Sequence, residues 1–251
     1  MPPPAHSVSS HYRRDTPPPR DAVVFDCDGV LVNTQDSWNR AYAELFTRYG
    51  ARLDRAQRHA LIGLQLIPLG HALARMLGHP APPDTLGREL YELVETNLDT
   101  AITPMPGVVA LLNALTGTRP LAVASNTPSP IVRSYLASVG IVDAFDHIIG
   151  SDNVPQPKPA PDTYLTACAR LGIDPRRAIA IEDSPTGVTA ALAAGMYVVG
   201  VPSSPDLNLP AHHTATTLHD PQLWMTLGLA PQHLSLGRRV RNTNGVSGVF
   251  G

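Results

Sequence analysis

VVFDCDGVL, residues 23–31, is an apolar run that carries two carboxylates spaced two positions apart. Side chains alternate across a strand, so Asp26 and Asp28 are predicted to lie on one side while Cys27 points to the other. Gly29 allows the backbone to turn tightly straight afterwards. Like charges this close repel each other, and a stable fold avoids them unless a cation is bound or one acid keeps its proton. The run therefore predicts a strand whose carboxyl end carries chemistry.

The later half of the chain alternates helical periodicity with short apolar runs. It predicts strands at 121–124, 147–149, 178–181 and 197–201, and helices at 108–115, 130–139, 162–171 and 185–194. Each of these helices is followed by a glycine, which suits the left-handed conformation of a helix C-terminal cap. Such alternation is typical of a parallel sheet with helices on both faces. The predicted fold class is α/β, with a doubly wound, Rossmann-like parallel-sheet core.

Helical periodicity also fills the stretch that follows the first strand. It predicts a helix from Trp38 to Gly50 and further helices at 56–62, 69–77 and 84–102. We therefore predict an α/β catalytic core made of residues 21–35 and 105–228, interrupted by a helical cap at 36–104. Ligands of such sheets bind at the carboxyl ends of the strands, so the cap is expected beside Asp26 and Asp28.

The composition indicates a soluble globular protein. A length of 251 residues, with 43% hydrophobic and 16% charged side chains, allows one sizeable core and a smaller second lobe. A net charge of −2 without a long basic stripe argues against a nucleic-acid partner. No window approaches the roughly 18 apolar residues of a membrane span, and no signal sequence is recognised. Cys27 and Cys168 give no disulfide framework, which fits a reducing compartment, so we expect a cytoplasmic protein.

The two ends of the chain differ in composition from the rest. Residues 1–20 are rich in proline and lack apolar periodicity, so they are predicted to form a disordered or polyproline-like arm. Residues 229–251 form a tail whose order the sequence leaves open, and the sequence gives no indication of the oligomeric state.

Two later segments bring phosphate-binding groups to the carboxyl ends of predicted strands. Ser125 and Asn126 end one strand just before a helix, and their hydroxyl and amide donors can hold a phosphate. Lys158 lies in a proline-stiffened loop before the next helix. A fixed ammonium there can neutralise phosphate charge.

A third segment adds two more acids at a strand end. Glu182 and Asp183 follow an apolar run, and Asp26 and Asp28 are expected at the same edge of the sheet. Together they offer hard oxygen ligands for one divalent cation, which is the kind of site that Mg²⁺ prefers.

Four segments, in chain order, carry a resemblance to a known family: FDCDGVLV, ASNT, KPAPDTY and IEDSPTGVTAALAAGM. They resemble the motifs of the haloacid dehalogenase superfamily of phosphohydrolases, and most closely those of the subgroup that holds β-phosphoglucomutase and the phosphoglycolate-phosphatase-like enzymes. The resemblance covers about residues 21–225, and the helical insertion looks like that superfamily's α-helical cap. It implies a Mg²⁺-dependent phosphomonoester hydrolase that acts on a small phosphorylated metabolite.

The resemblance implies a role for each matching residue. Asp26 would be the nucleophile that forms an aspartyl-phosphate, and Asp28 would protonate the leaving alcohol and then activate water. Ser125, Lys158 and the backbone of Asn126 would hold the transferring phosphoryl group. This division agrees with the physics, because a carboxylate can attack a phosphate dianion only if nearby cations offset the repulsion.

The resemblance also implies a metal site. Mg²⁺ would bind the side chain of Asp26, the backbone carbonyl of Asp28, Asp183 and Glu182. Asp183 is the safer ligand, because an ordinary strand-end role stays open for Glu182. Members of the superfamily that dehalogenate lack an acid at the position of Asp28, so its presence favours phosphate esters over haloacids.

Two departures from the pattern bear on the substrate. Trp38 stands where the phosphoglucomutase subgroup has a histidine that helps to discriminate sugar phosphate from water. The cap loop at 61–66 lacks the basic residues with which that subgroup grips a second phosphate. These differences favour a hydrolase, but two alternatives stay open: a β-phosphoglucomutase-like mutase and a non-catalytic protein that binds a phosphorylated metabolite.

Overall fold

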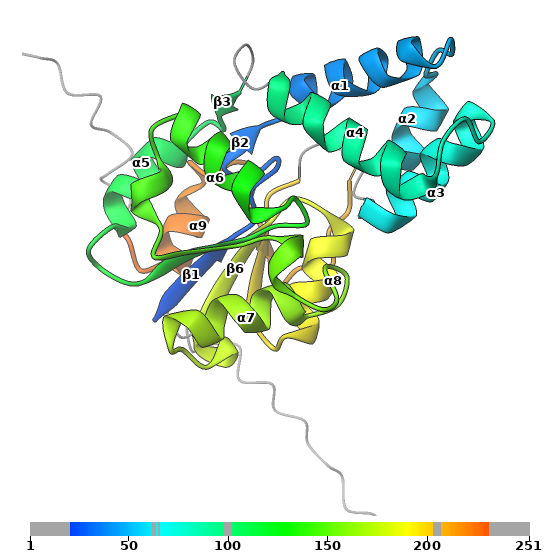
Figure 1. The fold of residues 1–251 in the computed structure, drawn as a ribbon. Coiled ribbons are helices and arrows are strands. Elements are labelled where there is room, and N and C mark those ends of the chain that lie inside the picture. The colour runs from blue at the N-terminus through cyan, green and yellow to red at the C-terminus, as the bar shows by residue number, and fades with distance from the viewer. Residues whose placement is uncertain (1–20, 62–63, 65, 98–101, 203–206, 231–251) are drawn as a thin grey trace, which may run out of the picture.

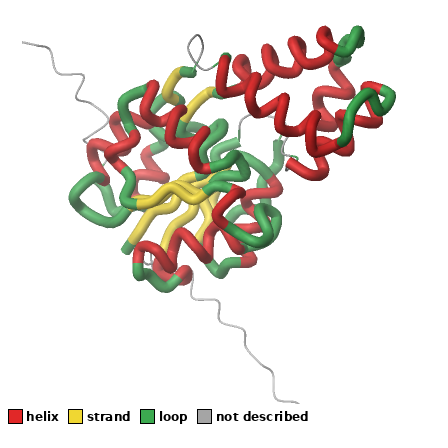
Figure 2. Tube along the Cα trace, viewed as in Figure 1, coloured by secondary structure: helices red, strands yellow, loops and turns green. Residues whose placement is uncertain are grey.

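The strand that leads directly to the paired acids, β1 (Ala22–Phe25), lies inside a six-stranded parallel sheet in the computed structural model of this chain. The structure describes residues 21–61, 64, 66–97, 102–202 and 207–230 (Figures 1 and 2). The predicted N-terminal arm, almost all of the C-terminal tail and part of the cap loop therefore lie outside the described residues.

The sheet has the strand order β5-β4-β1-β6-β7-β8. Its other members are β4 (Leu121–Ala124), β5 (His147–Ile149), β6 (Ala178–Glu182), β7 (Tyr197–Gly200) and β8 (His213–Thr214). In the register of the sheet, Phe25 pairs with Val123 on one side and with Ile181 on the other. The carboxyl ends of β4, β1 and β6 are therefore adjacent.

Helices cover both faces of the sheet, as the alternation in the sequence predicts (Figure 1). They are α5 (Val108–Leu115), α6 (Ser129–Ser138), α7 (Asp162–Leu171), α8 (Pro185–Ala193) and α9 (Pro221–Thr226). Val23 and Phe25 pack in the cluster that holds α5, α6 and α9, whereas Ala22 and Val24 pack in the cluster that holds α7 and α8. Because β1 is buried on both faces, its sequence is a continuous run of apolar residues.

The predicted elements of this region are confirmed. The four strands and four helices expected between 108 and 201 all occur with bounds within one residue of the prediction. The glycines that follow those helices all have positive φ, between 68° and 82°. Short 3₁₀ helices also occur at Val142–Ala144, Ser151–Asn153 and Pro175–Arg177.

A helical unit occupies the chain between β1 and α5. Its helices are α1 (Gln35–Arg48), α2 (Arg55–Leu61), α3 (Leu66–Leu77) and α4 (Pro83–Thr96). Figure 1 shows it as a second lobe beside the sheet. An antiparallel pair that the sequence did not predict, β2 (Val32–Asn33) with β3 (Thr103–Pro104), lies where the chain leaves for this unit and where it returns.

The prediction of a single helix from Asp84 to Ile102 is wrong at its C-terminal end. α4 ends at Thr96, where Nδ2 of Asn97 donates to the carbonyl oxygen of Leu93 at 2.8 Å. A side chain that bonds the last turn offers the backbone an alternative to continuing the helix. The chain is already extended at β3, which the apolar spacing through Ile102 did not indicate.

Both cysteines are buried free thiols. Cys27 lies in the larger core cluster and Cys168 in the smaller one, so they pack on opposite faces of the sheet. Within the described ranges, no helix combines the length and the apolar character needed to cross a membrane.

His212, which directly precedes the edge strand β8, forms a side-chain hydrogen bond to β7. The backbone N–H of Val198 donates to Nδ1 of His212 at 3.0 Å, and the imidazole stacks on the Tyr197 ring with the centroids 4.7 Å apart. Partial burial lowers the pKa of His212 below its ordinary value. Nδ1 can accept the hydrogen bond only while it is unprotonated.

We predict that His212 makes the fold less stable in mild acid. Because folding lowers the pKa of His212, its contribution to the free energy of unfolding is complete above the ordinary pKa of 6.5. That contribution is lost as the pH falls from 6.5 through the folded-state pKa. The lost hydrogen bond corresponds to about 1 kcal/mol. The midpoint of thermal unfolding should fall less between about pH 7.5 and about pH 5.5 in His212→Asn than in the wild-type protein, because the amide oxygen of asparagine accepts a hydrogen bond without titrating. An equal drop in both proteins would contradict this role.

Candidate active site

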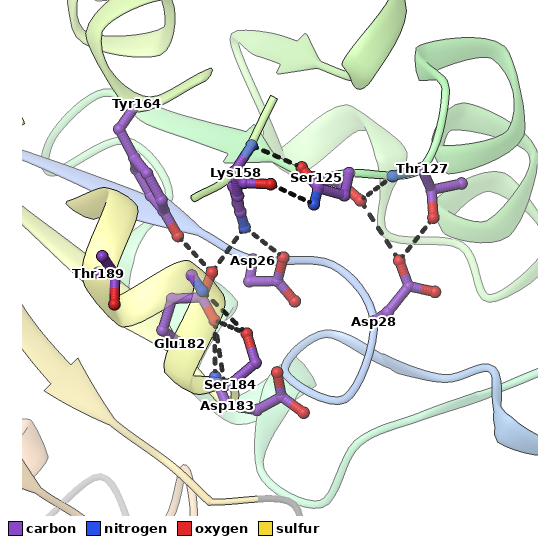
Figure 3. Close-up of polar contacts among 12 residues, drawn as sticks. Asp26, Asp28, Ser125, Thr127, Lys158, Tyr164, Glu182, Asp183, Ser184 and Thr189 are labelled. Atoms are coloured by element: carbon purple, nitrogen blue, oxygen red, sulfur yellow. Dashed lines mark hydrogen bonds and ion pairs between the residues drawn. The ribbon is translucent and has the colours of Figure 1, made fainter. Parts of the chain in front are cut away.

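The site lies where β1, β4 and β6 end side by side. Figure 3 shows side chains from these strand ends, and from the loop before α7, directed toward one another. Asp26 directly follows β1, and its backbone N–H donates to the carbonyl oxygen of Ile181 at 2.9 Å. The sheet's own hydrogen bonding therefore fixes the position of the first acid, which is 7% exposed.

A buried ammonium joins two of the acids. Nζ of Lys158 lies 2.6 Å from Oδ1 of Asp26 and 2.6 Å from Oε1 of Glu182, and the lysine is 3% exposed (Figure 3). Burial acts to lower the pKa of Lys158, but the two carboxylates outweigh it and raise the pKa. The two carboxylates therefore favour the charged form of the lysine, which lies against Asp26.

The loop that carries Lys158 is fastened to the end of β4. The backbone N–H of Lys158 donates to Oδ1 of Asn126 at 2.8 Å, and Nδ2 of Asn126 donates to the Lys158 carbonyl oxygen at 3.0 Å. The peptide bond from Lys158 to Pro159 is cis. Asn126 thus uses its side chain to hold the lysine loop, in addition to the backbone role that the family resemblance implies.

Glu182 is completely buried, and both of its oxygens are engaged. Oε1 accepts from Lys158 Nζ and, at 2.8 Å, from the hydroxyl of Tyr164. Oε2 accepts from the backbone N–H groups of Asp183 and Ser184, at 3.0 and 3.2 Å, and from the Ser184 hydroxyl at 3.1 Å. The close fit extends to Gly187, where an added Cβ would lie 1.6 Å from Oε1. Glu182 therefore connects the lysine to the turn that presents Asp183.

Asp28 is held by three hydroxyl groups. The Thr34 hydroxyl donates to Oδ1 at 2.7 Å, and the hydroxyls of Thr127 and Ser125 donate to Oδ2 at 3.0 and 3.3 Å. Thr34 occupies the N-cap position of α1 but makes no capping hydrogen bond. The start of the helical unit is therefore bonded directly to the second acid.

The site carries more negative than positive charge. Burial raises the pKa of Asp26 well above its usual range, and the neighbouring Glu182, Asp183 and Asp28 add to the rise while Lys158 opposes it. Single oxygens of Asp26, Glu182 and Asp183 all lie within 4.8 Å of one another. A divalent cation would relieve this repulsion, and carboxylate oxygens are the ligands that Mg²⁺ takes.

Gly29 lets Asp183 approach the loop after β1. Its φ is +88°, and a Cβ at this position would lie 2.3 Å from Oδ2 of Asp183. The glycine that the sequence assigned to a tight turn therefore also leaves room for the carboxylate of Asp183.

The structure brings the predicted site residues together at the carboxyl ends of β1, β4 and β6. These are Asp26, Asp28, Ser125, Asn126, Lys158, Glu182 and Asp183. The roles assigned to them stay predictions.

Sequence reasoning missed four residues that hold the predicted ones in place. Thr127, Tyr164 and Ser184 bond Asp28 or Glu182 and lie inside the quoted motifs, so their position in the motifs was a usable signal. Thr34 gave no such signal, because a threonine before a helix is adequately explained as an N-cap.

Comparisons with known proteins agree with the site. A family model described as "Haloacid dehalogenase-like hydrolase" matches residues 23–201. Fructose-1-phosphate phosphatase YqaB of Escherichia coli (strain K12) is 33% identical over 179 residues, covering 71% of this chain and 95% of that protein. Validoxylamine A 7′-phosphate phosphatase of Streptomyces hygroscopicus subsp. limoneus is 32% identical over 186 residues, covering 73% of this chain and 86% of that protein.

Solved structures share the fold. A mutant of CbbY from Rhodobacter sphaeroides, in complex with xylulose-(1,5)bisphosphate, matches with a TM-score of 0.70 at 28% identity. The match covers 79% of this chain and 94% of that one. It extends over both the sheet and the helical unit, since neither part alone accounts for so much of the chain.

We predict that replacing Gly29 by alanine disturbs cation binding in particular. Gly172→Ala is the matched control, because Gly172 also has positive φ, +68°, but no atom lies within 4 Å of an added Cβ. Both variants should lose about 1–2 kcal/mol in thermal unfolding because of the left-handed backbone. Only Gly29→Ala should weaken Mn²⁺ binding, about tenfold or more, as measured by electron paramagnetic resonance of free Mn²⁺. Equal Mn²⁺ affinity in the two variants would contradict a metal role for Asp183.

Proposed function

We propose that this chain, which belongs to the haloacid dehalogenase-like hydrolases, hydrolyses a small phosphorylated metabolite by way of a phosphorylated Asp26. It is a phosphatase of that family, that is, a phosphoric monoester hydrolase. The observation that carries the proposal is the 2.6 Å contact between Lys158 Nζ and Asp26. A buried carboxylate with a fixed ammonium beside it can approach a phosphate dianion without prohibitive repulsion.

In the first step, Asp26 attacks the phosphorus atom. A carboxylate oxygen of Asp26 forms a new bond to phosphorus while the bond from phosphorus to the ester oxygen breaks. Asp28, in its protonated form, donates its proton to the departing oxygen, so that the alcohol leaves neutral. An acyl phosphate on Asp26 and a carboxylate on Asp28 remain.

In the second step, water attacks the same phosphorus atom. Asp28 removes a proton from the water as the bond between phosphorus and the Asp26 oxygen breaks, which releases inorganic phosphate and restores both acids. The hydroxyls of Thr34, Ser125 and Thr127 suit this exchange, because they fix the carboxyl of Asp28 and can rotate as it gains or loses its proton.

The phosphoryl group would be held by Ser125, Lys158 and the backbone N–H of Asn126. The Ser125 hydroxyl accepts from the Thr127 N–H at 2.9 Å, which fixes it at the end of β4. Phosphoryl transfer asks a protein mainly for positioning and charge neutralisation, and these groups supply both.

We assign Mg²⁺ to Asp26, Asp183 and the backbone carbonyl of Asp28. The hard oxygen donors and their spacing fit such a cation, which when bound offsets the charge of the phosphoryl group and the acids. For Glu182 the contacts favour the strand-end alternative, because its two oxygens already accept five hydrogen bonds. Glu182 then acts on the cation only by presenting Asp183.

The names of the relatives suggest the class of substrate. Fructose 1-phosphate is a sugar monophosphate, and validoxylamine A 7′-phosphate is likewise a phosphorylated metabolite. We therefore place sugar monophosphates first among substrates. Trp38 packs edge-on against Tyr91, with centroids 5.6 Å apart, and lies 5.9 Å from Tyr42. An aromatic cluster where the mutase subgroup has a histidine favours hydrolysis over phosphoryl return to a sugar.

We predict that Asp26→Asn abolishes turnover. Asparagine keeps the size of the side chain but supplies no nucleophilic carboxylate, so release of phosphate from an aryl phosphate with Mg²⁺ should fall at least about 10³-fold. EDTA should abolish the wild-type activity. Asp84→Asn is the control, since Asp84 is an exposed acid in the first turn of α4.

Wild-type turnover by Asp26→Asn would overturn the nucleophile assignment. A panel of sugar monophosphates, phosphoglycolate and nucleoside monophosphates then identifies the substrate. Interconversion of sugar monophosphates primed by a bisphosphate would indicate the mutase instead, and no turnover of any compound would favour a binding protein.

A further inference from the structure

We propose that Tyr164 is a positioning residue for Lys158, acting through its hydroxyl on Glu182 and through its ring beneath the ammonium. The inference rests on the proposed function, because it assigns Tyr164 to the phosphoryl-binding lysine of that reaction. Figure 3 shows the arrangement: the tyrosine stands on the far side of Glu182 and Lys158 from Asp28.

The contacts place Tyr164 against both partners of the buried ion pair. Its hydroxyl donates to Oε1 of Glu182 at 2.8 Å, and this same oxygen accepts from Lys158 Nζ at 2.6 Å. The ammonium also lies 4.9 Å from the centroid of the Tyr164 ring, within the range of a cation–π interaction. One side chain therefore contacts both the lysine and the lysine's anchor.

Tyr164 is itself rigidly held. It is fully buried in the first turns of α7, and α7 packs against β1, β4 and β5. α7 begins four residues after Lys158. The helix thus fixes the ring relative to the strand ends, whereas the lysine alone has a long and flexible stem.

The hydroxyl matters because Oε1 has two donors. If Tyr164 gave no hydrogen bond, Lys158 would be the remaining donor to that oxygen, and the ammonium would be drawn toward Glu182 and away from Asp26. When a phosphoryl group binds, the Lys158 ammonium has to donate hydrogen bonds to its oxygens. A second donor keeps the buried oxygen of Glu182 satisfied while that happens, and an unsatisfied buried acceptor is costly.

The chain offers a matched pair of tyrosines for the test. Tyr135 is also fully buried, and its hydroxyl has no hydrogen-bond partner among the residues that the structure describes. Tyr164→Phe and Tyr135→Phe therefore make the same chemical change in buried positions, and only the first removes a bond to Glu182. Thermal unfolding checks that both variants fold.

We expect Tyr164→Phe to lower kcat for an aryl phosphate about tenfold while KM changes less than about twofold, because Lys158 acts mainly on the charge of the transition state. Tyr135→Phe should keep the wild-type kcat. Tyr164→Leu, which also removes the ring, should lose more than Tyr164→Phe. Wild-type kcat in Tyr164→Phe would overturn the hydroxyl role, and so would a change confined to KM. Equal losses in the Leu and Phe variants would overturn the ring role.

A structural readout separates this inference from the proposed function. In a crystal structure of Tyr164→Phe, Nζ of Lys158 should lie beyond hydrogen-bond distance of Asp26. If Nζ keeps both of its contacts, the positioning role is wrong whatever the activity. Failure of the proposed function would show instead as absence of phosphate release by the wild-type protein.

Discussion

One buried ammonium between two buried carboxylates is the constraint on which this site depends. Lys158 bridges Asp26 and Glu182 at 2.6 Å each, and both acids are almost or fully removed from solvent. Such charges are stable only when paired and hydrogen-bonded, since an isolated buried charge is strongly destabilising. Asp28 and Asp183 add negative charge beside this pair, so that the acids at the site outnumber the lysine. The excess makes the site receptive to a cation, and Lys158 makes Asp26 approachable by a phosphate.

The fold supplies this arrangement through strand adjacency. β4, β1 and β6 are neighbours, so residues that are about 60 to 160 positions apart in the chain lie at one edge of the sheet. Glycines then allow the acids to come close: Gly29 leaves room for Asp183, and Gly187 leaves room for Glu182. Thr34 extends the network to α1, which gives the helical unit a direct hydrogen bond to the proposed proton shuttle.

Much of the fold and of the residue set could be predicted from the sequence, because both depend on local patterns. The apolar runs and the glycine caps locate the strands and helices from Gly107 to Val201 closely. The partners of the acids were harder to predict. Tyr164 contacts Glu182 only because α7 folds back against the sheet. Its place in KPAPDTY was a signal, but hydrophobic periodicity alone does not distinguish it from a core tyrosine such as Tyr135. The end of α4 depends on one side-chain bond of Asn97, which hydrophobic spacing does not register.

The proposed role of Asp26 is to carry the phosphoryl group during turnover. It is tested most directly by adding borohydride to the protein during steady-state hydrolysis of an aryl phosphate with Mg²⁺, since an acyl phosphate is reduced there to an alcohol. Peptide mass spectrometry should find homoserine in place of Asp26, in an amount that depends on substrate. Homoserine at another acid, or an unmodified Asp26 in protein that is turning over, would contradict the claim.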